Sequence, residues 1–572
     1  MSKGLARERN AYATLLRTLF VVLVCAFAFS LPIRSQERAG ILADPTEPTP
    51  IPAGRAPAPG EYPAGFDALH YDINLTLPGS GSVIEGSTAI DIAVTADAPD
   101  TLALDFTGLS VTRLRVNDVV TRFVRAAGKL LVPVPRAADG NRIRVAIDYR
   151  GTPDDGLAIR ENVDGKRAVF ADNWPNRARF WFPSLDYPAD KATASFTIVA
   201  PPGWEVVANG TPDGQPTPSR LPDGTTGRRF KWRIEEPIST YNMVIGAADF
   251  RVQSVGRPCF TNGRCIDVTT WLFPGSVEKA AASFRRAAAM VEYFSQIIAP
   301  FPYDRLAHVQ SATRFGGMEN ATAIFYDERS LAEGRNIELT VAHETAHQWF
   351  GDAVTEPEWP QVWLSEGFAT YFAALFIEHA DGVAAFRQIL EEQRRRIVAP
   401  TRTAAPIVDT GEEDLFKLLN VDSYDKGSWV LHMLRGRLGD DRFFDGIRRY
   451  YREHEHGTGT TADLQRALEA ASGMNLTGFF DQWVFRPGFP RFRASSIWDA
   501  SRRTATITVE QIQPADWPTF STPLTLTLTT ASGTIRTSVD IDERLERYNL
   551  QLDAEPLSIV IDPDGWVLQD SR

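Results

Sequence analysis

Two histidines and two glutamates in the middle of this sequence have the types and spacing of a metal-dependent hydrolytic site. His343 and His347 are spaced so that, on a helix, both imidazoles leave the same face one turn apart. Two nitrogen ligands at this spacing suit one tetrahedral zinc ion, with bonds of about 2.0–2.1 Å. Glu366, on the next predicted helix, can supply a carboxylate as the third ligand. This ligand set leaves the fourth position of a catalytic zinc to water.

Glu344 lies between the two histidines and is expected to face the open side of the metal. A carboxylate there can accept a proton from the water as the water attacks a carbonyl carbon. The pattern H-E-x-x-H therefore predicts zinc-assisted hydrolysis. The alternative is two helix-surface histidines beside an acid. The apolar helix around the motif and the second acidic helix that follows it favour the zinc site.

Helical patterns surround these residues in the middle of the chain. Over 277–298, apolar residues recur at spacings of three and four, which is typical of a helix with one buried face. Two short runs, 306–311 and 323–326, are expected to be strands that precede the metal-binding helix. The same helical periodicity predicts further helices over 336–350, 364–379, 382–396, 424–438, 441–453 and 461–471.

Strand patterns lie on both sides of the helical middle. Alternating or β-branched runs separated by Gly, Pro, Asp and Asn indicate an N-terminal all-β, sandwich-like domain over 64–255. After Pro490 the strands return, which predicts a small C-terminal β-sandwich over 491–572. With a mainly helical domain over 256–490 between them, the chain is expected to be a multidomain α+β protein.

The beginning of the chain has the pattern of a secretory signal. An apolar run over 19–31 is too short to cross a bilayer core of about 30 Å, so no stable membrane span is expected. We predict a signal peptide over 1–35, a Pro-rich linker over 36–63, and export to the periplasm or the extracellular space. The basic residues that precede the apolar run are Lys3, Arg7, Arg9 and Arg17.

The net charge bears on the class of ligand, and the cysteine content bears on disulfide formation. The formal charge of -12 argues against binding nucleic acid, whose phosphates would be repelled. Removal of a signal peptide would leave only Cys259 and Cys265, which flank a short turn. In an oxidising compartment this pair favours a disulfide over the alternative of two free thiols.

Four segments, in order, carry a family resemblance. They resemble the M1 family of zinc aminopeptidases, the gluzincins related to aminopeptidase N and leukotriene hydrolase. His347 and Glu366 have the family spacing, with 18 residues between them. The resemblance implies a thermolysin-like catalytic domain with one zinc ion per chain. The segments are G-G-M-E-N at 316–320, H-E-T-A-H-Q-W-F-G at 343–351, W-L-S-E-G-F-A at 363–369 and Y-D-K-G at 424–427.

The resemblance also implies roles for residues outside the metal site. Glu319 would bind the free α-ammonium of the substrate and so restrict cleavage to chain ends. Gly316 and Gly317 would let the backbone run beside the substrate like an edge strand. Tyr424 would donate a hydrogen bond to the oxyanion of the tetrahedral intermediate.

One position departs from the family pattern. Many relatives supply a Gln or Glu to the amine pocket ahead of an A-R pair. Counting back from Ala178 and Arg179 leads here to Asp172, whose shorter side chain could still attract an ammonium. Asp172 is therefore a candidate substrate-binding residue, with a turn-capping aspartate as the alternative.

The sequence as a whole predicts a zinc-dependent aminopeptidase acting on peptides with a free N-terminus. An endopeptidase remains an alternative within the hydrolases, because zinc chemistry alone does not select chain ends. A catalytically silent peptide-binding protein is an alternative from another class. The presence of Glu344 beside the predicted ligands speaks against it, because a silent relative has no need of a general base.

Overall fold

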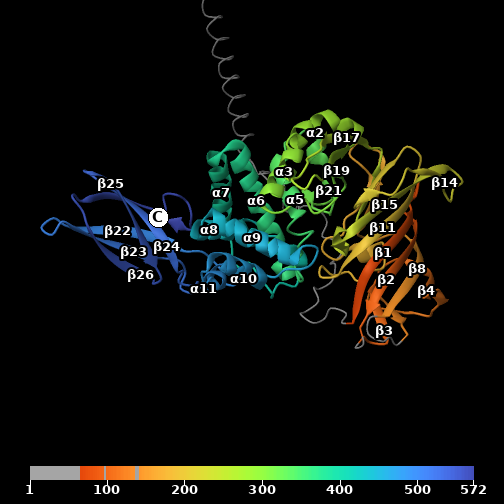
Figure 1. The fold of residues 1–572 in the computed structure, drawn as a ribbon, viewed down its shortest axis with the longest axis horizontal. Helices are drawn as coiled ribbons and strands as arrows, with labels where there is room; N and C mark the ends of the chain where they lie inside the picture. Colours follow the sequence, from red (N-terminus) through yellow and green to blue (C-terminus); the bar gives the residue numbers. More distant parts are fainter. Residues whose placement is uncertain (1–64, 96–97, 136–140, 572) are drawn as a thin grey trace, which may run out of the picture.

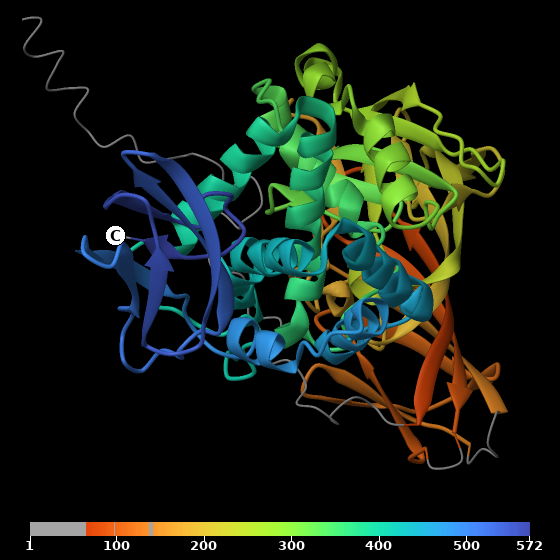
Figure 2. The ribbon, with the colours of Figure 1, turned by 60° about the vertical axis from the view of Figure 1, so that its left-hand side comes forward.

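The computed structural model describes residues 65–95, 98–135 and 141–571. The predicted signal peptide and the predicted linker both lie outside the described residues. Figures 1 and 2 show a β domain at each end of the molecule with a block of helices between them. The predicted multidomain α+β fold is confirmed.

The N-terminal domain is built on a large, mostly antiparallel sheet in the order β13-β15-β11-β1-β2-β8-β4-β5, with β14 also paired to β15. Smaller sheets, β3-β7-β6 and β12-β16-β10-β9, complete the domain. Alternation explains these strands: in β8, Ile143, Val145 and Ile147 are buried, whereas Arg142 and Arg144 face solvent.

The strands of this domain are β1 (Phe66–Thr76), β2 (Ile84–Val94), β3 (Thr101–Asp105), β4 (Ser110–Val116), β5 (Val119–Val120), β6 (Val124–Ala126), β7 (Lys129–Pro133), β8 (Asn141–Gly151), β9 (Leu157–Glu161), β10 (Arg167–Ala171), β11 (Lys191–Ala200), β12 (Glu205–Ala208), β13 (Thr211–Pro212), β14 (Thr217–Arg220), β15 (Thr226–Ser239) and β16 (Ile245–Ala248). Two short 3-10 helices are η1 (Ala178–Phe180) and η2 (Thr240–Asn242).

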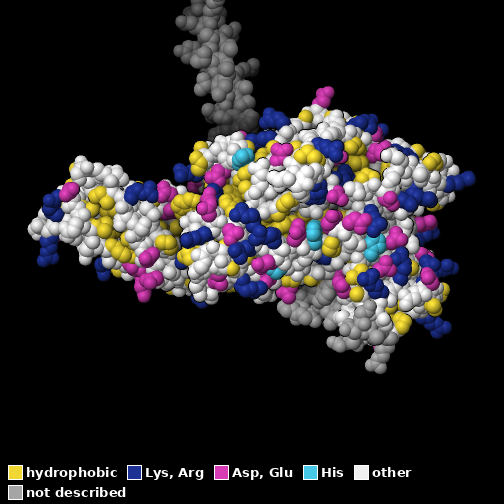
Figure 3. Space-filling view, in the orientation of Figure 1, with side chains coloured by type: hydrophobic (Ala, Val, Ile, Leu, Met, Phe, Trp, Pro, Cys, Tyr) yellow, Lys and Arg dark blue, Asp and Glu magenta, His cyan; other side chains and the backbone are white. Residues whose placement is uncertain are grey.

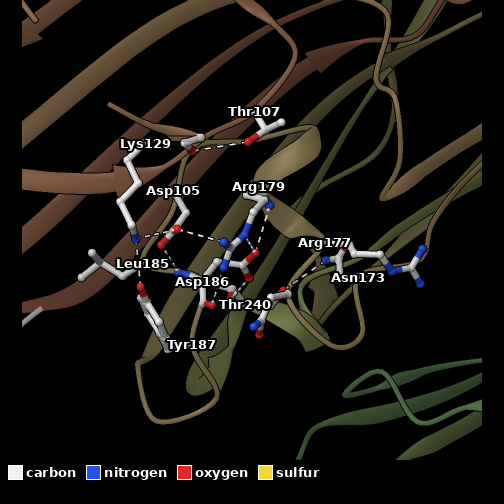
Figure 4. A network of polar contacts seen from close by, with 12 residues as sticks. Asp105, Thr107, Lys129, Asn173, Arg177, Arg179, Leu185, Asp186, Tyr187 and Thr240 are labelled. Atoms are coloured by element: carbon white, nitrogen blue, oxygen red, sulfur yellow. Dashed lines mark hydrogen bonds and ion pairs between the residues drawn. The ribbon is translucent and has the colours of Figure 1, made fainter. Parts of the chain in front are cut away.

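A polar network fixes the connection between β10 and β11 (Figure 4). Arg179 forms ion pairs with Asp105 at 3.0 Å and with Asp186 at 2.9 Å. Lys129 donates from Nζ to Asp105 at 2.8 Å, and the hydroxyl of Thr240 donates to Asp186 at 2.8 Å. Because buried charges are stable only when paired, this network holds the connection in one conformation. Arg179 of the A-R pair therefore has a structural role.

The central domain begins with a sheet in the order β17-β18-β19-β21-β20. The first strand starts at Arg251, a few residues before the predicted boundary at 255, because β17 pairs with β18 rather than with the N-terminal sheets. The β17–β18 connection contains a disulfide between Cys259 and Cys265, whose Cα atoms are 4.0 Å apart. The strands are β17 (Arg251–Gly256), β18 (Asp267–Leu272), β19 (Arg305–Ser311), β20 (Gly317–Met318) and β21 (Ala323–Asp327).

Helices make up the rest of the central domain. The helix expected over 277–298 is two helices, and Arg286 at the break binds Glu338 and Asp381 at 2.6–2.9 Å. The helices are α2 (Val277–Phe284), α3 (Ala287–Ile297), α4 (Glu328–Ala332), α5 (Glu338–His347), α6 (Trp363–Asp381), α7 (Val383–Ile397), α8 (Gly427–Leu438), α9 (Asp440–His454), α10 (Thr461–Ser472) and α11 (Thr477–Trp483), with the short turns η3 (Pro274–Ser276), η4 (Trp359–Gln361) and η5 (Leu415–Leu418) and the π-helix η6 (Asp422–Lys426).

The C-terminal domain has two facing sheets, β26-β23-β22-β28 and β25-β24-β27. It contacts the helices through Trp566, which stacks on His432 of α8 with ring centroids 4.6 Å apart. Its strands are β22 (Arg491–Asp499), β23 (Thr504–Gln511), β24 (Thr522–Thr530), β25 (Gly533–Ile541), β26 (Leu545–Gln551), β27 (Pro556–Ile561) and β28 (Asp570–Ser571).

The face of the molecule in Figure 3 carries acidic and basic side chains interspersed along its length, without a large patch of one sign. Among the described residues, none of the helices has both the length and the apolar content needed to cross a bilayer.

Two glycines allow α6 to pack closely against α8 and η6. A Cβ atom on Gly367 would lie 3.0 Å from the Cα atom of Gly427 and 3.1 Å from the carbonyl oxygen of Ser423. Contacts this short with backbone atoms leave no room for a side chain. The close approach brings Glu366 of α6 and Tyr424 of η6 into the same region.

We expect Gly367→Val to lower stability by about 1–3 kcal/mol, because the added methyl groups force α6 away from α8. The midpoint of thermal unfolding measures the effect. Gly478→Val is the matched control, since Gly478 lies in a helix with no atom near its would-be Cβ. Equal shifts for the two variants would show that the α6–α8 contact does not require glycine.

Candidate active site

The three predicted zinc ligands meet between α5 and α6. The Nε2 atoms of His343 and His347 are 2.9 Å apart. The Oε2 atom of Glu366 lies 3.1 Å from Nε2 of His343 and 3.2 Å from Nε2 of His347. A tetrahedral zinc with bonds of about 2.0–2.1 Å needs ligand atoms about 3.3 Å apart. The donor atoms therefore fit a zinc ion, and all three side chains are buried.

The other nitrogen of each imidazole is held by a hydrogen bond acceptor. Nδ1 of His347 is 3.0 Å from the carbonyl oxygen of Phe350, and the hydroxyl of Ser365 is 3.1 Å from the same nitrogen. Nδ1 of His343 is 3.4 Å from the hydroxyl of Thr370. When Nδ1–H donates in this way, the lone pair of Nε2 is directed toward the metal position.

The acidic side chains of the pocket favour a bound cation. Burial and, to a lesser extent, Glu366 raise the pKa of Glu319 to about 7, although the neighbouring His347 opposes the shift. Although burial disfavours its charged form, His347 has a pKa well above the usual value because Glu366, Glu319 and Glu344 surround it. Burial and the neighbouring His347 lower the pKa of His343 to about 4, so His343 is neutral and free to bind a metal.

Glu344 extends along the backbone of β20. A Cβ atom on Gly317 would lie 2.2 Å from the Oε1 atom of Glu344, so the carboxylate lies directly against the Cα atom of that glycine. Burial raises the pKa of Glu344, and Glu319 and Glu366 add to the shift. A glutamate with a raised pKa is a stronger base than an exposed one. β20 itself is the edge strand of the five-stranded sheet, with Gly317 opposite Tyr326.

Glu319 lies beside the metal ligands, and its backbone is anchored to α5. Oxygen atoms of Glu319 and Glu344 and a nitrogen of His347 all lie within 4.8 Å of one another. Gln348, the residue after His347, donates through Nε2 to the carbonyl oxygen of Glu319 at 2.7 Å. Its Oε1 atom accepts from the backbone N–H of Thr322 at 2.8 Å. Gln348 thus ties the G-G-M-E-N segment to the metal-binding helix.

Tyr424 reaches the pocket from the π-helix η6. Its ring stacks on that of His343 at a centroid distance of 5.9 Å and an interplanar angle of 10°. Burial raises the pKa of the Tyr424 phenol well above 10, and Glu366 raises it further, so the hydroxyl stays protonated and can donate. The π-helix is held by Asp425, which accepts two bonds from Arg396 at 2.6 and 2.7 Å. A π-helical turn at a functional side chain is a recurring feature of active sites.

Asp172 is buried and paired with two arginines. Its Oδ1 atom lies 2.8 Å from Nη2 of Arg177, and its Oδ2 atom accepts from Nε of Arg314 at 3.0 Å. Burial opposes ionisation, but Arg177 and Arg314 outweigh it and lower the pKa of Asp172. Asp172 is not among the residues that line the pocket at the metal site. Its role in substrate binding stays a prediction.

The structure adds residues that the sequence patterns did not reveal. Trp174, Phe315, Met318 and Leu419 form part of the lining of the pocket at the metal site. Phe315 and Met318 flank Gly316 and Gly317, so their position in the sequence could have identified them as pocket residues. Trp174 and Leu419 come from distant segments and carry no such signal. Gln348 was detectable as a polar residue within a predicted apolar helix.

Models of two domains from one family match most of the chain. They are the Peptidase family M1 domain over residues 283–483 and the Peptidase M1 N-terminal domain over residues 67–241. The chain belongs to peptidase family M1. The M1 domain contains the three residues whose donor atoms fit zinc, and the N-terminal domain contains Asp172 and Trp174.

Several curated relatives are similar over a large part of the chain. Aminopeptidase 2 of Candida albicans is 26% identical over 461 residues, which is 76% of this chain and 49% of that protein. Aminopeptidase N of Streptomyces lividans is 27% identical over 475 residues, covering 78% and 53% of the two chains. Glutamyl aminopeptidase of Homo sapiens is 27% identical over 369 residues, covering 60% and 36%. The chain thus spans about half or less of the length of these relatives.

The fold of this M1 chain is also that of a solved structure. Legionella pneumophila aminopeptidase A, crystallised in complex with aspartic acid, matches with a TM-score of 0.77 at 16% identity. The match covers 89% of this chain and 60% of the other. At this level of identity the likeness shows a shared fold.

Loss of one ligand should weaken zinc binding by more than about 100-fold, because even partners that only orient a ligand contribute 10- to 100-fold. We therefore expect His343→Ala to be purified without zinc, as measured by elemental analysis of metal per chain. The control is His379→Ala, which removes an exposed histidine from α6. Full zinc content in His343→Ala would contradict the proposed ligand set.

Proposed function

We propose that this chain is a zinc-dependent aminopeptidase that hydrolyses the first peptide bond of peptides with a free N-terminus. One observation carries the proposal. The carboxylate of Glu319 lies within 4.8 Å of Glu344 and His347, in the pocket where three donor atoms fit zinc. A buried carboxylate so close to the metal site can pair with the ammonium of a first residue and would block an extended chain on that side.

Each side chain then has a separate task. Zinc, when bound by His343, His347 and Glu366, would polarise the first peptide carbonyl and activate water for attack. Glu344 accepts the proton of the attacking water and passes it to the leaving amine. Glu319 binds the ammonium and sets the distance from the chain end to the bond that breaks.

Tyr424 completes the proposed mechanism. Its protonated hydroxyl donates to the carbonyl oxygen as negative charge develops there. A donor of this kind contributes about 3–4 kcal/mol to stabilising the transition state. Because the π-helix and Asp425 hold the ring in place before substrate binds, little reorganisation is needed during the reaction.

Two other functions would use the same pocket. An endopeptidase would need no carboxylate at the position of Glu319, and a silent peptide-binding protein would need no base at the position of Glu344. The names of the relatives from Candida albicans and Streptomyces lividans describe those proteins as aminopeptidases, which supports exopeptidase cleavage here.

Free and N-acetylated aminoacyl amides carrying a fluorophore distinguish these functions. We expect wild type to cleave only the free amines and Glu344→Gln to lower kcat by about 10²- to 10⁴-fold with zinc retained. Glu319→Ala should lower kcat/KM for free amines on the order of 100-fold, because it removes a buried charge pair with the substrate. Glu278→Gln, an exposed change on α2, is the control. Equal cleavage of acetylated substrates would indicate an endopeptidase instead.

We also propose that the protein is exported. The basic residues and short apolar run at the start of the sequence support this, as does the pairing of Cys259 with Cys265. We expect the mature protein to begin after Ala28 or after Ser35, and thus without Cys25. Intact-mass measurement with and without thiol alkylation tests both points. A full-length chain with alkylated cysteines would argue for retention in a reducing compartment.

A further inference from the structure

One wall of the pocket has no task in the proposed reaction. The metal ligands, Glu344, Glu319, Gly317 and Tyr424 account for part of the lining. The remaining lining residues are all apolar. They are Trp174, Phe315, Met318 and Leu419.

The aromatic part of this wall is packed rigidly. Trp174 meets Phe315 edge-to-face at a centroid distance of 6.0 Å and Phe416 at 5.5 Å. It also contacts Trp359 at 5.4 Å. Trp174 itself is 3% exposed, so its surface toward the pocket is a fixed apolar surface rather than a mobile flap. Such a surface favours an apolar group and gives no partner to a charged one.

A neutral quartet of charges lies behind the wall and joins two domains. Asp172 and Asp155 alternate with Arg177 and Arg314: Arg177 pairs with both aspartates at 2.8 Å, and Arg314 pairs with them at 3.0 and 2.9 Å. Arg314 belongs to the central domain, whereas the other three come from the N-terminal domain.

The quartet bonds the backbone of Trp174 and adjoins Phe315 in the chain. Arg177 donates through Nε to the carbonyl oxygen of Trp174 at 2.7 Å, and Arg314 immediately precedes Phe315. The side chain of Arg177 is fully buried, and its guanidinium lies 5.9 Å from the ring centroid of Phe416. With both oxygens engaged by arginines, the Asp172 carboxylate has its charge already compensated.

We propose that Trp174, Phe315, Met318 and Leu419 receive the first side chain of the peptide and select an apolar residue, and that Asp172 is a positioning residue for this wall rather than an amine ligand. This inference rests on the proposed function, since it takes Glu319 as the residue that binds the ammonium. Acidic first residues are disfavoured because the pocket already holds three carboxylates, and basic ones because each of those carboxylates has another task.

Binding of amino-acid amides to the zinc-loaded Glu344→Gln chain tests the selection without turnover. Isothermal titration calorimetry should give leucinamide and phenylalaninamide affinities on the order of 10- to 100-fold above that of glycinamide, from burial of the side chain. Lysinamide and the α-amide of glutamic acid should not exceed glycinamide. Tighter binding of either charged amide, or no preference for leucinamide over glycinamide, or no binding of any amide, overturns the proposal.

Three further substitutions in the Glu344→Gln chain test whether these residues form the apolar wall. Trp174→Ala and the half-buried Leu419→Ala should each reduce the ratio of leucinamide to glycinamide affinity by about tenfold, whereas Trp174→Phe should largely keep it. Trp498→Ala, in β22 of the C-terminal domain, is the matched control. An unchanged ratio in both alanine variants contradicts the assignment.

Asp172→Asn separates positioning from amine binding. If Asp172 positions the wall, leucinamide affinity falls more than glycinamide affinity, so the ratio drops. If Asp172 binds the amine, all amides weaken equally and the ratio is unchanged. Thermal unfolding confirms that the variant is folded. Selective binding in a chain whose wild type does not hydrolyse any free-amine substrate would support the pocket and reject the proposed aminopeptidase function.

Discussion

A carboxylate that leaves water is stable as an anion only when a cation or hydrogen-bond donors replace its hydration. Glu319, Glu344 and Glu366 lie together in a buried pocket, where His343 and His347 provide the nearest partners. All three can be ionised together only if surrounding elements hold each side chain in place and a cation lies among them. The close packing of α5, α6 and η6 around the pocket meets the first of these two requirements.

The N-terminal β domain also helps to hold the pocket residues in place. Lys191 of β11 donates to the carbonyl oxygens of Asp352 and Ala353, both at 2.9 Å, just beyond the metal-binding helix. Asn209 donates to the carbonyl oxygen of Ala321 at 2.7 Å, close after Glu319. Together with Gln348, these bonds hold the Glu319 segment from two domains. The pocket is therefore a product of the domain interface, and the β domain does more than accompany the catalytic one.

Interactions across that interface also explain the departure at Asp172. In this chain the acid is neutralised by Arg177 and Arg314, and the nearby Trp174 faces the pocket instead. Glu319 is the carboxylate that we propose binds the ammonium, and apolar side chains line another part of the same pocket. A buried ion pair formed in such surroundings is stronger than one exposed to water, so one carboxylate can serve where relatives use more polar groups.

Local sequence was sufficient to predict the metal site, because the spacing of His343 and His347 acts through helical geometry, which the backbone sets within one turn. The strand and helix patterns likewise predicted the order of the three domains. Only the tertiary structure decided three further features. They are the partners of Asp172, the apolar wall with Trp174 and Leu419, and the membership of β17 in the central sheet. Each depends on contacts between residues far apart in the chain, whose distances are set by how whole domains pack rather than by the periodicity of any segment.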